Sequence, residues 1–120
     1  NLVADIDTLE AFENPNEVKV VMDKELNALY FSREPIPSRK KGVLEVPMKK
    51  QVCVIPFTRD FLLEYNQMEP TPLEIIESVD MMRILENGEK FVNTTILASA
   101  DWKDKPYMLI YEKLLIIMKT

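Results

Sequence analysis

The sequence predicts an α/β fold, because segments with the pattern of strands alternate along the chain with segments with the pattern of helices. Two features carry most of this prediction. One is a pair of β-rich runs separated by a polar turn, and the other is a helix start at Thr71 with a full set of capping residues. The chain has 120 residues, of which 47% are hydrophobic, which is enough for one compact unit but not two. We therefore expect a single domain over residues 1–120.

The N-terminal region predicts a short helix followed by a hairpin. The DTLEAF stretch can form a helix that is capped by Asp7 or Thr8 and ends before Pro15. The run VKVVM (18–22), the polar turn DKELN and the run ALYFS (28–32) then indicate two antiparallel strands joined by a loop of about five residues.

The middle of the chain predicts a loop, a strand and a helix. Residues 33–50 are rich in proline and in basic residues, which favours a loop. The valine- and isoleucine-rich run QVCVIPF (51–57) indicates a strand. In the segment TRDFLLEYNQM that follows, Thr58 or Asp60 can cap a helix.

The best-specified helix begins at Thr71. Thr71, Pro72 and Glu74 supply an N-cap hydroxyl, a proline at the first helical position and the glutamate of a capping box. We expect this helix to continue to Asn87 and to end at Gly88, since glycine adopts the left-handed conformation most easily. Residues 91–97 then indicate a strand, and residues 107–118 a terminal element for which a helix is slightly favoured.

Composition excludes several kinds of site. The chain has no histidine, which removes Ser/His/Asp and Cys/His catalytic arrangements and the usual zinc sites. It has only two glycines, too few for a phosphate-cradling GxGxxG or Walker loop. The net charge of -5 argues against general nucleic-acid binding.

Cellular location is also constrained by composition. Cys53 lies in an apolar run without a partner cysteine, so we expect a small core residue in a reducing compartment, the cytoplasm. No apolar run approaches the ~20 residues that span a bilayer, and the N-terminus lacks a signal-peptide core. We expect neither secretion nor a membrane anchor.

Three blocks of sequence resemble the CMP-Kdo synthetase (3-deoxy-manno-octulosonate cytidylyltransferase) family. They are AFENPNEVKVVMDKELNALYFSREPIP, KQVCVIPFTRDFLLEY and EPTPLEIIESVDMMRILENGEK, and together they cover roughly residues 5–90 in uninterrupted order. The text from residue 91 to residue 120 diverges from the family pattern. The resemblance is to the C-terminal, sugar-acid-binding half of these enzymes, and it implies part of a Rossmann-like mixed sheet of the nucleotide-diphospho-sugar transferases, with a protruding β-hairpin.

The resemblance implies transfer of a cytidylyl group from CTP to a sugar-acid hydroxyl, in lipopolysaccharide biosynthesis, with Mg²⁺ neutralising the phosphates. The family's glycine-rich nucleotide loop and its QGDEP-like magnesium motif are not present in these 120 residues. We therefore expect a truncated chain that is inactive alone and binds no Mg²⁺ alone. The missing nucleotide-binding half would come from more upstream chain or from another polypeptide.

The resemblance also nominates site residues. Arg33, at the end of the LYFSR arm, matches an arginine that faces the sugar-acid pocket, where a guanidinium can grip a carboxylate, although an exposed strand-end arginine is the alternative. Gln51 stands where Kdo-activating relatives often carry histidine and could donate to a sugar hydroxyl, although an ordinary strand-edge glutamine is slightly favoured. This departure leaves the identity of the sugar acid open.

Three acidic residues complete the set. Glu74 and Glu77 lie on one face of the predicted helix and could accept hydrogen bonds from sugar hydroxyls, but the capping box already accounts for Glu74. Asp104 lies at about the spacing of the family's second metal-binding aspartate, and plain helix capping is the favoured alternative.

Two other functions remain open. The family's hairpin arm contributes to a homodimer interface, so the chain could be a non-catalytic dimerisation module. It could also be a stand-alone sugar-acid binder.

Overall fold

In the computed structural model, the described residues (1–43 and 45–96) form a five-stranded mixed sheet with four short helices. The elements in chain order are β1 (Leu2–Asp5), α1 (Leu9–Glu13), β2 (Lys19–Met22), β3 (Ala28–Ser32), β4 (Lys49–Val52), α2 (Arg59–Tyr65), α3 (Pro72–Glu77), α4 (Met82–Glu86) and β5 (Thr94–Ile96). The expected α/β class is confirmed. The terminal element expected over residues 107–118 lies outside the described residues.

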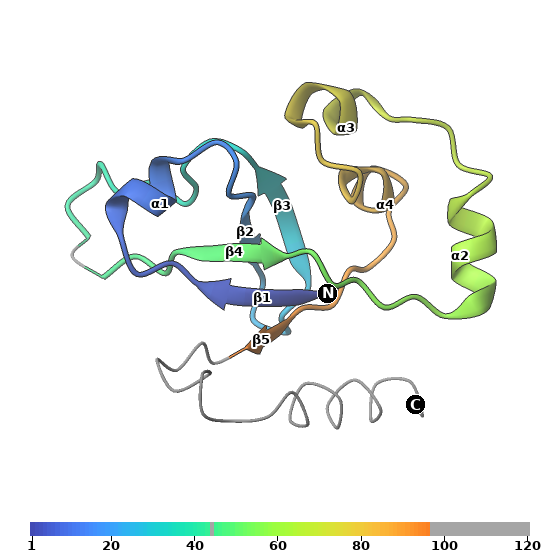
Figure 1. The fold of residues 1–120 in the computed structure, drawn as a ribbon, viewed down its shortest axis with the longest axis horizontal. Coiled ribbons are helices and arrows are strands. Elements are labelled where there is room, and N and C mark those ends of the chain that lie inside the picture. The colour runs from blue at the N-terminus through green and yellow to red at the C-terminus, as the bar shows by residue number, and fades with distance from the viewer. Residues whose placement is uncertain (44, 97–120) are drawn as a thin grey trace.

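The strands lie in the order β3-β2-β4-β1-β5. The pairs β2–β3, β2–β4 and β1–β4 are antiparallel, whereas β1 and β5 are parallel. The β2–β3 pair forms where the two β-rich runs predicted it, and it occupies one edge of this sheet (Figure 1). Strand β1 is not among the predicted elements, although the apolar run at the N-terminus supplies it.

The helices begin where short polar side chains cap them. The Thr8 hydroxyl accepts a hydrogen bond from the amide of Ala11 at the start of α1, and the Thr58 hydroxyl does the same for Phe61 at the start of α2. Each is one of the two capping residues that the sequence offers for its helix.

The single helix expected from Thr71 to Asn87 is wrong. The chain leaves the helical conformation at Ser78, which has a φ of 53° in the left-handed region, and resumes as α4 at Met82. Figure 1 shows α3 and α4 as separate coils. The break changes the direction of the chain, so that apolar residues after Ser78 enter the core. A straight helix would hold these residues away from the core. Gly88 does follow the last turn with a φ of 76°, as predicted.

The expected strand over residues 51–57 is also wrong in its bounds. It begins at Lys49 and ends at Val52, and Cys53 is exposed rather than buried in the core. The chain bends directly after β4, and Pro56 cannot donate to a sheet ladder, so the apolar run continues as irregular backbone. Within that run, Ile55 and Phe57 pack against the core.

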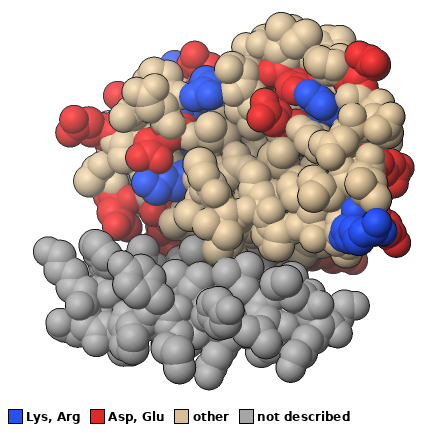
Figure 2. Space-filling view, turned by 45° about the vertical axis from the view of Figure 1, so that its right-hand side comes forward, with Lys and Arg blue, Asp and Glu red and all other residues tan. Residues whose placement is uncertain are grey.

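The hydrophobic core joins the sheet to the segment around α4. Phe31 of β3 is fully buried and meets Phe91 edge-on, with ring centroids 5.5 Å apart and an interplanar angle of 81°. The buried cluster consists of Val3, Val20, Ala28, Phe31, Val79, Met81, Met82, Ile84 and Phe91. Acidic and basic side chains are interspersed over the face drawn in Figure 2, and uncharged residues occupy its middle.

Candidate functional site

Arg33 lies immediately after β3, where the hairpin of β2 and β3 (the hairpin arm) meets the C-terminal end of α3. Its Nε donates to the carbonyl oxygen of Glu77 (3.0 Å), and Nη2 donates to the carbonyl oxygen of Ser78 (2.7 Å). Its Nη1 donates to the carbonyl oxygen of Pro15, in the loop after α1 (3.0 Å). The guanidinium therefore joins three segments that are distant in the sequence, and a second N–H remains on each terminal nitrogen.

The carboxylate of Glu77 faces the same arm. One oxygen accepts from the Tyr30 hydroxyl (2.9 Å), and the other accepts from the Ser32 hydroxyl (2.9 Å) and from the backbone amide of Arg33 (3.1 Å). Burial, together with the bond to Glu77, raises the pKa of Tyr30. The structure thus brings Arg33 and Glu77 together through hydrogen bonds between protein groups.

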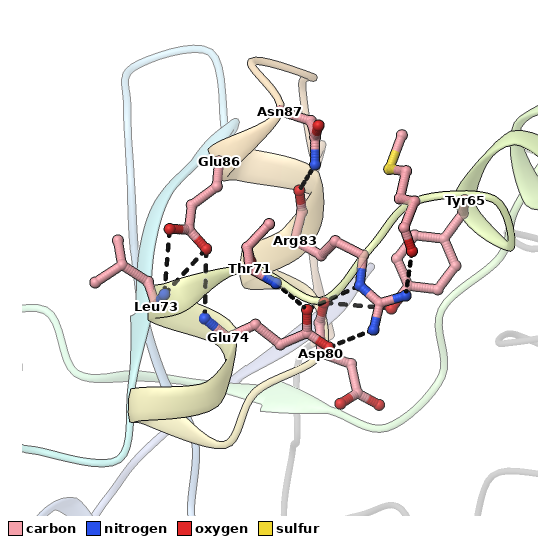
Figure 3. Close-up of polar contacts among 9 residues, drawn as sticks. Tyr65, Thr71, Leu73, Glu74, Asp80, Arg83, Glu86 and Asn87 are labelled. Carbon is pink, nitrogen blue, oxygen red and sulfur yellow. Dashed lines mark hydrogen bonds and ion pairs between the residues drawn. The ribbon is translucent and has the colours of Figure 1, made fainter.

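Glu74 occupies a separate, structural position beside Arg83. Its carboxylate accepts from Nε (2.8 Å) and Nη2 (2.5 Å) of Arg83 and from the Thr71 amide (3.1 Å), as Figure 3 shows. The hydrogen bonds from Arg83 hold the pKa of Glu74 below its usual value. The guanidinium of Arg83 also lies 4.9 Å from the ring centre of Tyr65.

The glutamate half of the expected capping box forms at the start of α3, where the Glu74 carboxylate accepts from the Thr71 amide. The Thr71 hydroxyl is buried and has no hydrogen-bond partner among the described residues. The amides of Leu73 and Glu74 donate instead to the carboxylate of Glu86, which reaches back from α4 (Figure 3). The cap is the alternative that the sequence offers for Glu74, and the ion pair with Arg83 is an addition that the sequence does not predict.

Gln51 lies in β4, half-buried. Because Lys19 of β2 pairs with both Ser32 and Lys50, the neighbours of these two residues, Arg33 and Gln51, follow strand positions that lie two strand spacings, or about 10 Å, apart. Their side chains nevertheless have different partners. The amide nitrogen of Gln51 donates to the side-chain oxygen of Asn1 (3.4 Å), whereas Arg33 donates to carbonyl oxygens of Pro15, Glu77 and Ser78.

Lys19 is a buried cation that the sequence reasoning missed. It lies in β2 with no exposed surface, and its Nζ donates to the carbonyl oxygen of Asn14 (2.8 Å). Burial lowers the pKa of Lys19, while the carboxylates of Glu34 and Glu17 act in the opposite direction. A lysine inside the otherwise apolar run VKVVM is the signal that could have identified it.

A cluster of metal ligands is not found among the described residues. Within residues 1–43 and 45–96, no group of three or more cysteine, aspartate or glutamate side chains could hold a metal ion. Asp104, the residue nominated for metal binding, lies outside these ranges. None of the helices within the same ranges has the length and hydrophobicity needed to cross a membrane.

Comparison with known proteins adds a family to this geometry. A family model described as cytidylyltransferase matches residues 1–91. The chain belongs to the cytidylyltransferase family. The 3-deoxy-manno-octulosonate cytidylyltransferase of Fusobacterium nucleatum is 49% identical to this chain over 82 residues, which are 68% of this chain and 33% of that protein.

Two further comparisons agree with the assignment to the cytidylyltransferase family. The 3-deoxy-manno-octulosonate cytidylyltransferase of Synechococcus elongatus is 45% identical over 82 residues, 68% of this chain and 34% of that protein. A solved structure of CMP:2-keto-3-deoxy-manno-octonic acid synthetase complexed with CTP matches 99% of this chain and 48% of that chain, with a TM-score of 0.74 and 29% identity. The chain thus spans about a third of the length of the curated cytidylyltransferases.

Proposed function

We propose that this chain supplies the C-terminal, sugar-acid-binding half of a cytidylyltransferase of the CMP-Kdo synthetase type. The observation that carries the proposal is the continuous family match over residues 1–91, together with relatives that are named for 3-deoxy-manno-octulosonate (Kdo). The Rossmann-like character of the complete fold and the protruding hairpin arm belong to the same proposal. So do a cytoplasmic location and a part in lipopolysaccharide biosynthesis.

In this proposal, the reaction transfers a cytidylyl group from CTP to a hydroxyl of Kdo and releases diphosphate. The 120 residues contain two glycines and no phosphate-cradling glycine motif, so the nucleotide would be held by other residues of the complete enzyme. The contribution of this chain would be to bind and orient the sugar acid, and Arg33 would offer its remaining N–H groups to the carboxylate. Gln51 remains a candidate for a sugar hydroxyl.

Titration with Kdo tests the sugar-acid part. We expect saturable binding of Kdo by calorimetry, and a rise in the melting temperature at saturating Kdo. Arg33→Lys keeps the charge but cannot form two parallel bonds to a carboxylate, so it should weaken binding at least 10-fold. Lys24→Ala, in the exposed turn of the same hairpin, is the matched control and should bind Kdo as the wild type does. Absence of any Kdo binding would refute the proposal.

Titration with CTP and Mg²⁺ tests the division of labour. We expect no heat of binding from the 120-residue chain, because it carries no nucleotide loop. Tight CTP binding would contradict the assignment of this chain to the sugar-acid side. Kdo binding without CTP turnover, even in the presence of a supplied nucleotide-binding half, would favour the stand-alone binder.

A homodimerisation module is the second candidate, and exposed apolar side chains favour it. Ile75 and Ile76 of α3 are 68% and 75% exposed, and Leu29 of the edge strand β3 is 60% exposed. Exposed apolar side chains on a helix and on an edge strand are typical of a surface that another copy covers.

Sedimentation at micromolar concentration tests this candidate. We expect a dimer that dissociates in the double variant Ile75→Lys/Ile76→Lys. The control is Leu62→Lys/Leu63→Lys, which places the same charges on exposed leucines of α2. A wild-type chain that remains monomeric would refute the module.

A further inference from the structure

Arg33 and Glu77 contact each other reciprocally. The side chain of Arg33 donates to the backbone oxygen of Glu77, while the side chain of Glu77 accepts from the backbone amide of Arg33. Each side chain thus binds the main chain of the other residue. Because both bonds involve an ionised group, they are stronger than neutral hydrogen bonds.

Neighbouring groups hold both members of this pair in place. The hydroxyls of Tyr30 and Ser32 bind the two carboxylate oxygens of Glu77, one each. The Ser78 carbonyl, which accepts from Arg33, follows the last turn of α3, where a cation is favoured by the unpaired carbonyl groups of a helix end. The contact is therefore built from β3, α3 and the loop after α1 at once.

We propose that Arg33 and Glu77 are positioning residues that lock the end of β3 to the end of α3. The proposal rests on the proposed function for its ligand. The lock holds the guanidinium in one orientation before the ligand arrives, so that the remaining N–H on each terminal nitrogen is available to the carboxylate of a sugar acid. In this arrangement Glu77 acts through Arg33 and does not itself contact the sugar.

A fixed guanidinium binds a carboxylate more tightly than a mobile one, because less side-chain freedom is lost on binding. Arginine loses more rotamer entropy on ordering than most residues, and the lock incurs this loss during folding. The free energy of sugar-acid binding therefore does not include it.

Hydrogen exchange in the absence of ligand tests the lock directly. In Glu77→Ala, the backbone amide of Arg33 loses its acceptor, and its exchange should accelerate about 10-fold or more. The amide of Ile84 in α4 donates to Met81 and serves as the internal reference, which should keep its protection. Unchanged exchange at Arg33 in Glu77→Ala would overturn the lock, whether or not Kdo binds.

The conservative variant separates positioning from direct contact. In Glu77→Gln, the amide oxygen can still accept from Ser32 and Arg33, and the amide nitrogen can donate to the Tyr30 oxygen. We expect Arg33 protection and Kdo affinity within about threefold of wild type in this variant, and a loss of about 10-fold in both in Glu77→Ala. A loss of Kdo binding in Glu77→Gln with Arg33 still protected would make Glu77 a ligand contact and overturn the proposal.

Two controls keep the outcome decisive. Ile84→Val removes a buried methyl group away from the lock, so it should lower stability without changing Kdo affinity.

If Glu77→Ala does not fold, Tyr30→Phe and Ser32→Ala each remove one anchor of Glu77 and should accelerate Arg33 exchange more mildly. Protection of Arg33 that survives both substitutions would count against the lock. Failure of the wild type to bind Kdo would refute the proposed function, and the ligand-free exchange would still decide the lock.

Discussion

Phe31 joins the hairpin arm to the core, so its removal tests the packing that places the candidate site. The side chain has no exposed surface, and its ring meets Phe91 edge-on. Burying such a side chain stabilises a fold by about 1.5–3 kcal/mol, and an edge-on aromatic pair adds about 0.5–1.5 kcal/mol. With the cavity that remains, Phe31→Ala should lower the free energy of unfolding by about 3–5 kcal/mol.

Leu29 provides the matched control, since it lies in the same strand but is 60% exposed. Leu29→Ala should change the free energy of unfolding by about 0.5 kcal/mol or less. Urea denaturation followed by far-ultraviolet circular dichroism measures the free energy of unfolding of both variants. The slope of this free energy against urea concentration should be the same in both variants and in the wild type. If Phe31→Ala cost as little as Leu29→Ala, the burial of Phe31 against Phe91 and the placement of the arm would be refuted.

Three further predictions concern charge and backbone. The pKa of Glu74 is lowered by Arg83, so the ion pair stabilises the fold above the unfolded pKa of glutamate, and this stabilisation is lost as the pH falls through the folded pKa. Denaturation from pH 7 to pH 3 should show this loss, and Arg83→Met, already destabilised at pH 7, should show less of it. Gly88→Ala should cost about 1 kcal/mol by thermal denaturation because the φ of Gly88 is 76°, and Gly88→Asn should cost less. Burial lowers the pKa of Lys19, so stability should rise as the pH increases through the folded pKa, and Lys19→Met should abolish that rise in denaturation measured from pH 7 to pH 10.

The sequence predicted those features that depend on neighbouring residues, namely the helix caps and the glycine at a helix end. Thr8 and Thr58 cap their helices, the glutamate of the capping box binds the Thr71 amide, and Gly88 takes the left-handed conformation. Each of these features depends on groups that lie within three or four residues of one another in the chain, so it can be predicted from the sequence alone.

Candidate site residues were harder to interpret from sequence. The family resemblance nominated Arg33 and Glu77, but nothing in the spacing of residues 33 and 77 indicates that each binds the main chain of the other. The spacing likewise does not indicate that Arg83 of α4 binds the carboxylate of Glu74 in α3. Nor does it indicate that Lys19 donates to a carbonyl oxygen in the loop after α1. These contacts depend on where distant segments meet.

The sequence by itself determined the α/β class, the paired runs of the hairpin and most helix starts, since these depend on periodicity, composition and nearest neighbours. The family followed from the resemblance of three blocks of sequence to known members, and the family model that matches residues 1–91 agrees with it. Only the tertiary structure decided that the expected helix from Thr71 to Asn87 breaks at Ser78, that Cys53 faces solvent, and that Arg33 reaches Glu77. Each of these features depends on where distant segments of the chain meet. The gain from burying apolar side chains and pairing charges across the fold exceeds the roughly 0.5–1 kcal/mol by which local propensities distinguish one backbone conformation from another.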